Sequence, residues 1–197
     1  MIMKTKTEQL DELFHKWHSE QKKSDFKNRD HFSEDGLIKT DDENCVVLFV
    51  LPEPHSDDHG REPSWFSHIF DDNNEYYNKS SRSNKTNLTK YKNRIEECAK
   101  SLGVNEKDIP HGIAVMDMKK CGGGKALSRK VFYKYVDTFA EFIKKQIEIL
   151  DPKYIVACGD PAYNALQRIG LDEGTKDKIK KTWHLSAQKS TSDFEIK

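Results

Sequence analysis

Three short apolar segments constrain the fold of this chain more than any other feature. They are residues 45–51 (CVVLFVL), 113–118 (IAVMDM) and 154–158 (YIVAC), and each is followed by a turn signal and then a helical pattern. A nearly continuous apolar run of this length is typical of a strand buried on both faces of a parallel sheet. Because such strands alternate with helices, the sequence predicts an α/β fold, a three-layer α/β/α domain with a mostly parallel central sheet.

The helical segments have regular apolar spacing. Leu10, Leu13, Phe14 and Trp17 recur at i, i+3, i+4 and i+7, which predicts an amphipathic helix over residues 4–22. Further helices are predicted at residues 127–150 and 161–170, and a charged connection at residues 23–44. The length of 197 residues suits one compact domain. Within it we expect residues 1–44 to form an N-terminal helix and connection, and residues 45–197 the α/β domain.

The overall charge excludes a histone-like polycation. Lysine and arginine number 33 and so do the acidic residues, so any contact with nucleic acid must come from segregated charge. One such segment, residues 79–95, carries six basic residues and no acid, and is either a phosphate-binding surface or a solvated helix face. The six are Lys79, Arg82, Lys85, Lys90, Lys92 and Arg94.

Hydropathy and cysteine spacing indicate where the protein works. No run approaches the ~18 apolar residues that span a bilayer, so we expect a cytoplasmic protein without membrane contact. The four cysteines, Cys45, Cys98, Cys121 and Cys158, have no Cys-x-x-Cys spacing and are predicted to be buried free thiols rather than ligands of zinc or of an iron–sulfur cluster.

Polar side chains cluster where the predicted strands end, which is where open α/β sheets bind ligands. The segment 51–60 (LPEPHSDDHG) is either a solvated acidic turn or a set of metal ligands, namely His55, Asp57, Asp58 and His59. The triplet Gly122, Gly123 and Gly124 precedes a helix, which favours either a phosphate site or a flexible turn. A third cluster, residues 183–187 (WHLSA), follows the basic stretch 176–181.

Taken in order over roughly residues 45–190, these segments resemble the uracil-DNA glycosylase superfamily. Leu51-Pro52-Glu53-Pro54-His55 is similar to the Gly-Gln-Asp-Pro-Tyr motif of that family, and Trp65 and Phe66 follow where the family has its base-stacking aromatic. Residues 112–117 resemble the strand whose last residue reads the base, and residues 184–186 resemble the late His-Pro-Ser loop. The chain departs from these motifs at Leu51, His55, Asp117 and Leu185, and the four-cysteine iron–sulfur branch is not matched.

The resemblance implies a role for each matched residue. Glu53 would activate water and stabilise the sugar cation, with Asp57 or Asp58 as alternative carboxylates, while His184 would donate a hydrogen bond to the departing base. His55, Trp65, Phe66 and Asp117 would hold the extruded base. The expected contacts to DNA phosphates are Gly122, Gly123, Gly124, Lys120, Lys125 and Ser186. No cofactor and no metal are implied, and we expect a monomer.

Asp117 sets the expected substrate class. An asparagine matches uracil because it accepts from N3–H and donates to O4, whereas an ionised aspartate only accepts and suits the N4 amino group of cytosine. We therefore expect a DNA glycosylase that excises a modified cytosine, for example from bacteriophage DNA as a host defence. Three alternatives stay open: a uracil-DNA glycosylase, since a protonated Asp117 mimics asparagine, a non-catalytic DNA-binding module of the same fold, and a metal-dependent phosphohydrolase.

Overall fold

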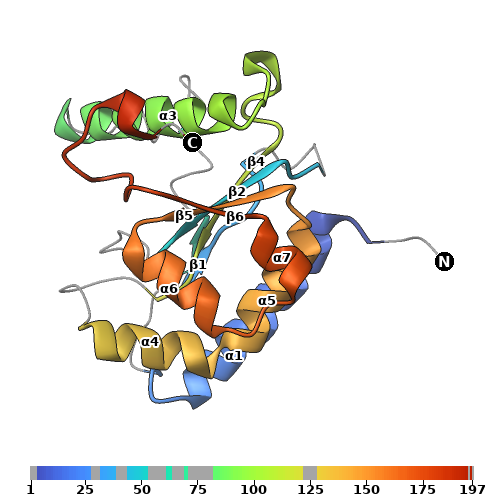
Figure 1. The fold of residues 1–197 in the computed structure, drawn as a ribbon. Helices are drawn as coiled ribbons and strands as arrows, with labels where there is room; N and C mark the ends of the chain where they lie inside the picture. Colours follow the sequence, from blue (N-terminus) through green and yellow to red (C-terminus); the bar gives the residue numbers. More distant parts are fainter. Residues whose placement is uncertain are drawn as a thin grey trace.

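A four-stranded parallel sheet forms the centre of the protein (Figure 1). The computed structural model describes residues 4–27, 32–38, 44–52, 61–63, 69–70, 82–121, 128–194 and 196, with the backbone alone for 61–63 and 82–88. The strands are β2 (Val47–Leu51), β4 (Ile113–Asp117), β5 (Tyr154–Cys158) and β6 (Ile179–Thr182). Their order across the sheet is β4-β2-β5-β6, and every neighbouring pair is parallel. The predicted α/β fold with a parallel central sheet is confirmed.

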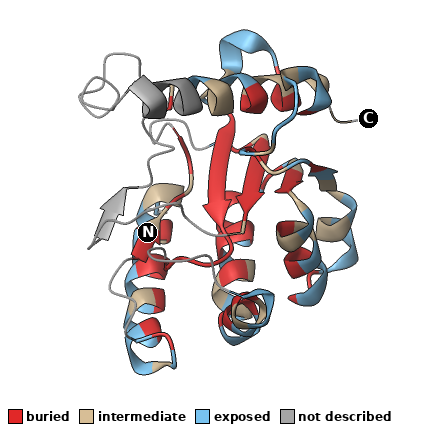
Figure 2. Ribbon diagram, turned by 90° about the vertical axis from the view of Figure 1, so that its left-hand side faces the viewer, coloured by how far each residue is buried: buried red, intermediate tan, exposed pale blue. Residues whose placement is uncertain are grey.

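Both faces of the sheet are covered, which is why its central strands read as unbroken apolar runs (Figure 2). Alternate residues of β2 enter two different cores: Leu48 and Val50 pack on one face, and Val47, Phe49 and Leu51 on the other. The first core is completed by α1 (Lys6–Lys23), α4 (Arg129–Thr138), α5 (Ala140–Leu150) and α6 (Asp160–Arg168). The second is completed by α3 (Arg82–Ser101) and the C-terminal turn η3 (Thr191–Phe194).

The predicted N-terminal helix is confirmed as α1. Thr5 caps it, since its side chain accepts from the backbone N–H of Glu8 while the Glu8 carboxylate accepts from the Thr5 N–H. The predicted helix over 127–150 is instead two helices, α4 and α5, which meet at Phe139. The Phe139 side chain is buried in the first core, so the residue between the two helices packs against the same face of the sheet as they do.

The segment 23–44 was predicted as a connection, and that prediction is wrong for part of it. Residues Phe32–Glu34 form β1, which pairs with β3 (Arg61–Pro63), and Leu37 forms an antiparallel bridge to Ala114 of β4. Because Phe32 and Leu37 are buried in the first core together with α1, the N-terminal segment belongs to the same hydrophobic core as the sheet.

The remaining elements are short. They are η2 (Glu106–Asp108) before β4, and α7 (Glu173–Asp177) between α6 and β6. All four cysteines are free and buried, as predicted. Within the described residues, no helix combines the length and the apolar character needed to cross a membrane.

Candidate functional site

Asp117 ends strand β4 at the carboxyl edge of the sheet, beside the end of β2. It pairs in register with Leu51. Beyond the strands the two chains stay joined, because the N–H of Met118 donates to the Leu51 carbonyl at 2.8 Å and the N–H of Lys119 donates to the Pro52 carbonyl at 3.1 Å. The residue after Pro52 in the sequence is Glu53, so the chain segment with the predicted acid continues from the strand next to Asp117.

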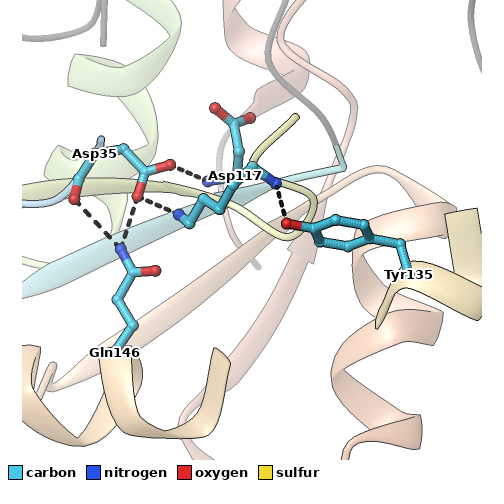
Figure 3. A network of polar contacts seen from close by, with 5 residues as sticks. Asp35, Asp117, Tyr135 and Gln146 are labelled. Carbon is cyan, nitrogen blue, oxygen red and sulfur yellow. Dashed lines mark hydrogen bonds and ion pairs between the residues drawn. The ribbon is translucent and has the colours of Figure 1, made fainter. Parts of the chain in front are cut away.

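The Asp117 side chain belongs to the α3 face of the sheet. It follows Ile113 and Val115 at a spacing of two, and both of these pack in the second core. Asp117 is 1% exposed. Figure 3 shows its carboxylate directed away from Asp35 and Gln146. Burial raises the pKa of the Cys158 thiol well above its ordinary value, and the charges of Cys98 and Asp117 add to that shift. Asp117 therefore acts electrostatically on the end of β5.

A buried polar network fixes the backbone of Asp117 from the opposite face (Figure 3). The Asp35 carboxylate accepts from the N–H of Asp117 at 2.8 Å and from the Gln146 amide at 2.7 Å, and it forms an ion pair with Lys120. The Lys120 backbone N–H donates to the Tyr135 hydroxyl at 3.3 Å. Both side chains of the ion pair have no exposed surface.

Lys120 does not lie where a phosphate contact requires it. Its ammonium group sits 5.4 Å from the centre of the Phe14 ring and 5.2 Å from that of Trp17, in the first core. Burial lowers the pKa of Lys120 below its usual value, and the negative charges of Asp35 and Asp117 oppose that shift. The prediction that Lys120 binds a DNA phosphate is wrong. Its position implies a structural role beneath Asp117.

His184 lies just beyond strand β6 and folds back over the end of β5. A Cβ atom placed on Gly159 would be 3.3 Å from the His184 Cβ, and Gly159 has φ +91°, so both space and backbone conformation favour glycine there. The Ser186 N–H donates to His184 Nδ1 at 3.2 Å, and the Ser186 hydroxyl lies 2.7 Å from the same nitrogen. Because Nδ1 accepts from the backbone N–H, the neutral ring carries its proton on Nε2.

Arg94 of α3 holds the loop that carries His184. Its guanidinium donates to three backbone carbonyls, those of Leu185, Ala187 and Lys189, the last two at 2.7 Å, and stacks 4.4 Å from the Phe194 ring centre. Arg94 is fully buried, so the expectation that it lies on a phosphate-binding or solvated helix face is wrong for this residue. The sequence did not single out Arg94, because it lies among lysines of the same helix that are typical of an exposed surface.

The strand order brings Asp117 and His184 to one edge of the sheet. Asp117 ends β4, β2 is the next strand, and β5 with Gly159 beneath His184 follows. The two strand spacings from β4 to β5 amount to about 10 Å. Leu185, next to His184, packs in the same core as Leu51 and Cys158, so the His184 loop and the Asp117 side chain lie on the same face.

Several predicted site residues lie outside the described residues. They are Glu53, His55, Asp57, Asp58, His59, Trp65, Phe66, Gly122, Gly123, Gly124 and Lys125. Ser186 is described, is exposed, and contacts His184 as given above. Within the described ranges, no group of three or more His, Cys, Asp or Glu side chains is arranged to hold a metal ion.

Comparison with known protein families gives no match to this chain, and no curated protein matches its sequence.

Proposed function

We propose that the protein is a DNA glycosylase that excises a modified cytosine and leaves an abasic site. The observation that supports this proposal is that Asp117 and the loop of His184 lie at the same edge of the sheet and on its α3 face, with the end of β2 between the ends of β4 and β5. The sequence continues from the end of β2 through Pro52 into Glu53. The acid and the imidazole are the two groups that bond cleavage needs, and the base reader selects the substrate.

The chemistry divides between the two ends of the broken bond. As the bond from base to deoxyribose breaks, positive charge develops on the sugar and negative charge on the carbonyl oxygen of the base. Glu53 stabilises the sugar cation and orients the attacking water. His184 donates from Nε2 to the base oxygen, and the hydrogen bond from Ser186 to Nδ1 supports this tautomer. A neutral donor of this kind stabilises the leaving base without transferring a proton to it.

The electrostatics around Asp117 favour a cytosine-type base. The charges of the buried Lys120 ammonium and of the Asp117 carboxylate attract each other. An ionised carboxylate takes a hydrogen bond from the N4 amino group of cytosine but repels the O4 of uracil. Excision of unmodified cytosine would damage the host genome, so the enzyme has to select a substituent on the ring. Phage DNA containing such cytosines is the substrate that we assign.

One observation favours uracil as a second candidate substrate. Asp117 is 1% exposed, and burial favours the neutral form of a carboxylic acid. A protonated Asp117 presents one donor and one acceptor, as asparagine does, and then matches uracil.

The test is base release from duplex and single-stranded oligonucleotides that contain uracil, cytosine or a 5-substituted cytosine. We expect abasic sites only in the substituted series. Glu53→Gln and His184→Ala should abolish or strongly reduce release while the protein still folds. If either variant retains the biological effect of the wild type, the protein acts as a binding module, and activity that disappears with a chelator would indicate a metal-dependent phosphohydrolase instead.

A further inference from the structure

Trp183 is exposed at the same edge of the sheet. Among the residues that the structure describes, it is the one large hydrophobic side chain that is exposed, with 51% of its surface accessible. It stands directly before His184, and the proposed chemistry gives it no role. A tryptophan presents a large flat ring that can stack on another aromatic group, and here the ring stands next to the proposed reacting group.

The chain on both sides of Trp183 is firmly held. Thr182 is buried before it, and Leu185 is 1% exposed after it. Arg94 then binds the carbonyls of Leu185, Ala187 and Lys189. The indole therefore projects from an anchored loop. Because the loop is already ordered, it loses little conformational entropy when a ligand binds.

A lysine ammonium lies over the indole. The Lys189 ammonium lies 4.4 Å from the centre of the Trp183 ring, on one of its faces. Lys181, on the edge strand β6, precedes Trp183 by two positions, but its ammonium forms an ion pair with Asp160 at 2.6 Å, so Lys189 is the cation at the indole. An aromatic surface with a lysine beside it combines the two properties that bind single-stranded nucleic acid, a stacking plane for the base and a cation for the phosphates.

We propose that Trp183 and Lys189 form a stacking platform for an unpaired nucleobase that flanks the reacting nucleotide, so that the protein prefers single-stranded or locally opened DNA to a fully paired duplex. In a paired duplex both faces of an internal base are already stacked, whereas an unpaired base gains a new contact on the indole. The proposal rests on the proposed function only in bringing DNA to this edge of the sheet.

The test measures the Kd of the full chain for a labelled strand of about 12 thymidine nucleotides, and for the same strand paired with its complement, at fixed salt. Thymidine offers no cytosine or uracil, so no base is removed during the measurement. The variants are Trp183→Ala, Trp183→Phe and Lys189→Ala. Lys153→Ala is the matched control, because the Lys153 ammonium also covers an aromatic ring, Tyr154, at 5.1 Å, but at the opposite end of β5.

We expect Trp183→Ala to weaken single-strand binding about tenfold and duplex binding less than about threefold, since only the stacked base is lost. Trp183→Phe should retain most of the affinity because it keeps a ring, Lys189→Ala should weaken binding, and Lys153→Ala should leave it unchanged. The platform is refuted if the wild type does not bind the single strand, if Trp183→Ala binds it as the wild type does, or if that variant loses equal affinity for both forms of DNA.

The two proposals fail separately. A wild type that releases no base from any oligonucleotide, but loses single-strand affinity on Trp183→Ala, contradicts the glycosylase proposal and supports the platform. A wild type that releases base with unchanged DNA affinity in Trp183→Ala supports the glycosylase and overturns the platform.

Discussion

The carboxylate of Asp35 accepts a hydrogen bond from the backbone N–H of Asp117 at 2.8 Å, although 82 positions separate the two residues in the chain. The same carboxylate forms a fully buried ion pair with Lys120. The proposed base reader is thus fixed through its backbone by a charged network on the α1 face, while its side chain belongs to the α3 face. The residue that we propose as the base reader is therefore also tied to the stability of the core.

We predict that Asp35→Asn strongly destabilises the protein. The variant leaves the Lys120 ammonium buried without its counter-charge, which costs about 3–5 kcal/mol when one partner of a buried pair is removed. The matched control is Asp25→Asn, which breaks an ion pair between two exposed side chains, Lys134 at 61% and Asp25 at 74%, and it should change the free energy of unfolding far less than Asp35→Asn does. Urea unfolding measures both. Equal losses would mean that the buried pair contributes no more than a surface one.

Arg94→Met is predicted to loosen the His184 loop. It removes the donor for three backbone carbonyls and should lower the free energy of unfolding by about 3 kcal/mol, because hydrogen bonds from a charged group are the stronger kind. Arg168→Met removes an exposed arginine paired with Asp137 at 2.6 Å and should have little effect. Base release should fall in Arg94→Met at temperatures where the variant is fully folded. Full activity there would contradict the positioning role.

The apolar runs and helical spacings of the sequence predicted the central parallel strands and most of the helices. The runs that became β2, β4 and β5 are unbroken because helices cover both faces of these strands. Strand β6 was missed because its sequence, Ile179-Lys180-Lys181-Thr182, is polar, as suits the edge of a sheet, where lysines discourage pairing with another chain. The split between α4 and α5 was missed because Phe139 continues the apolar stripe.

The candidate site was only partly visible in the sequence. Asp117 was singled out as the last residue of a strand-like run, and His184 was singled out because residues 184–186 resemble the late His-Pro-Ser loop. Asp35 and Arg94 were not found as site residues, because each is a charged residue that local patterns place at the surface. Their burial depends on partners that are distant in the chain, Lys120 for Asp35 and the carbonyls of 185–189 for Arg94. No local spacing encodes such pairs.

His184→Ala is predicted to lower kcat for base release by a factor of about 10²–10³, the usual cost of losing one donor to a developing oxyanion. Ser186→Ala removes the hydroxyl but keeps the backbone N–H that fixes the tautomer, so its kcat should fall by less than about tenfold. Single-turnover assays at saturating DNA compare the two variants. Equal losses would contradict the assignment of the backbone N–H as the group that orients the ring.

The buried thiols should be unreactive in the folded protein. Burial raises the pKa of Cys45 from its ordinary 9.0 to about 12, and that of Cys98 likewise to about 12. At about pH 8 a disulfide reagent should therefore label the four cysteines only after unfolding.

The same pKa shifts predict how stability depends on pH. Above pH 9 the unfolded chain loses thiol protons that the folded chain keeps. The stability that these thiols contribute is therefore complete below pH 9 and falls as pH rises toward 12. Cys45→Ala should make that decline less steep, and rapid labelling of the folded protein would contradict the burial.

The most direct test of the central claim exchanges the base reader. Asp117→Asn supplies a donor where the wild type has only acceptors, and base release should be measured for both proteins on matched oligonucleotides containing a 5-substituted cytosine or uracil. We predict that the wild type releases the substituted cytosine and spares uracil, and that Asp117→Asn shifts release toward uracil. A wild type that releases uracil and leaves every cytosine intact, or a variant with an unchanged preference, would contradict the assignment of Asp117 as the reader of a cytosine-type base.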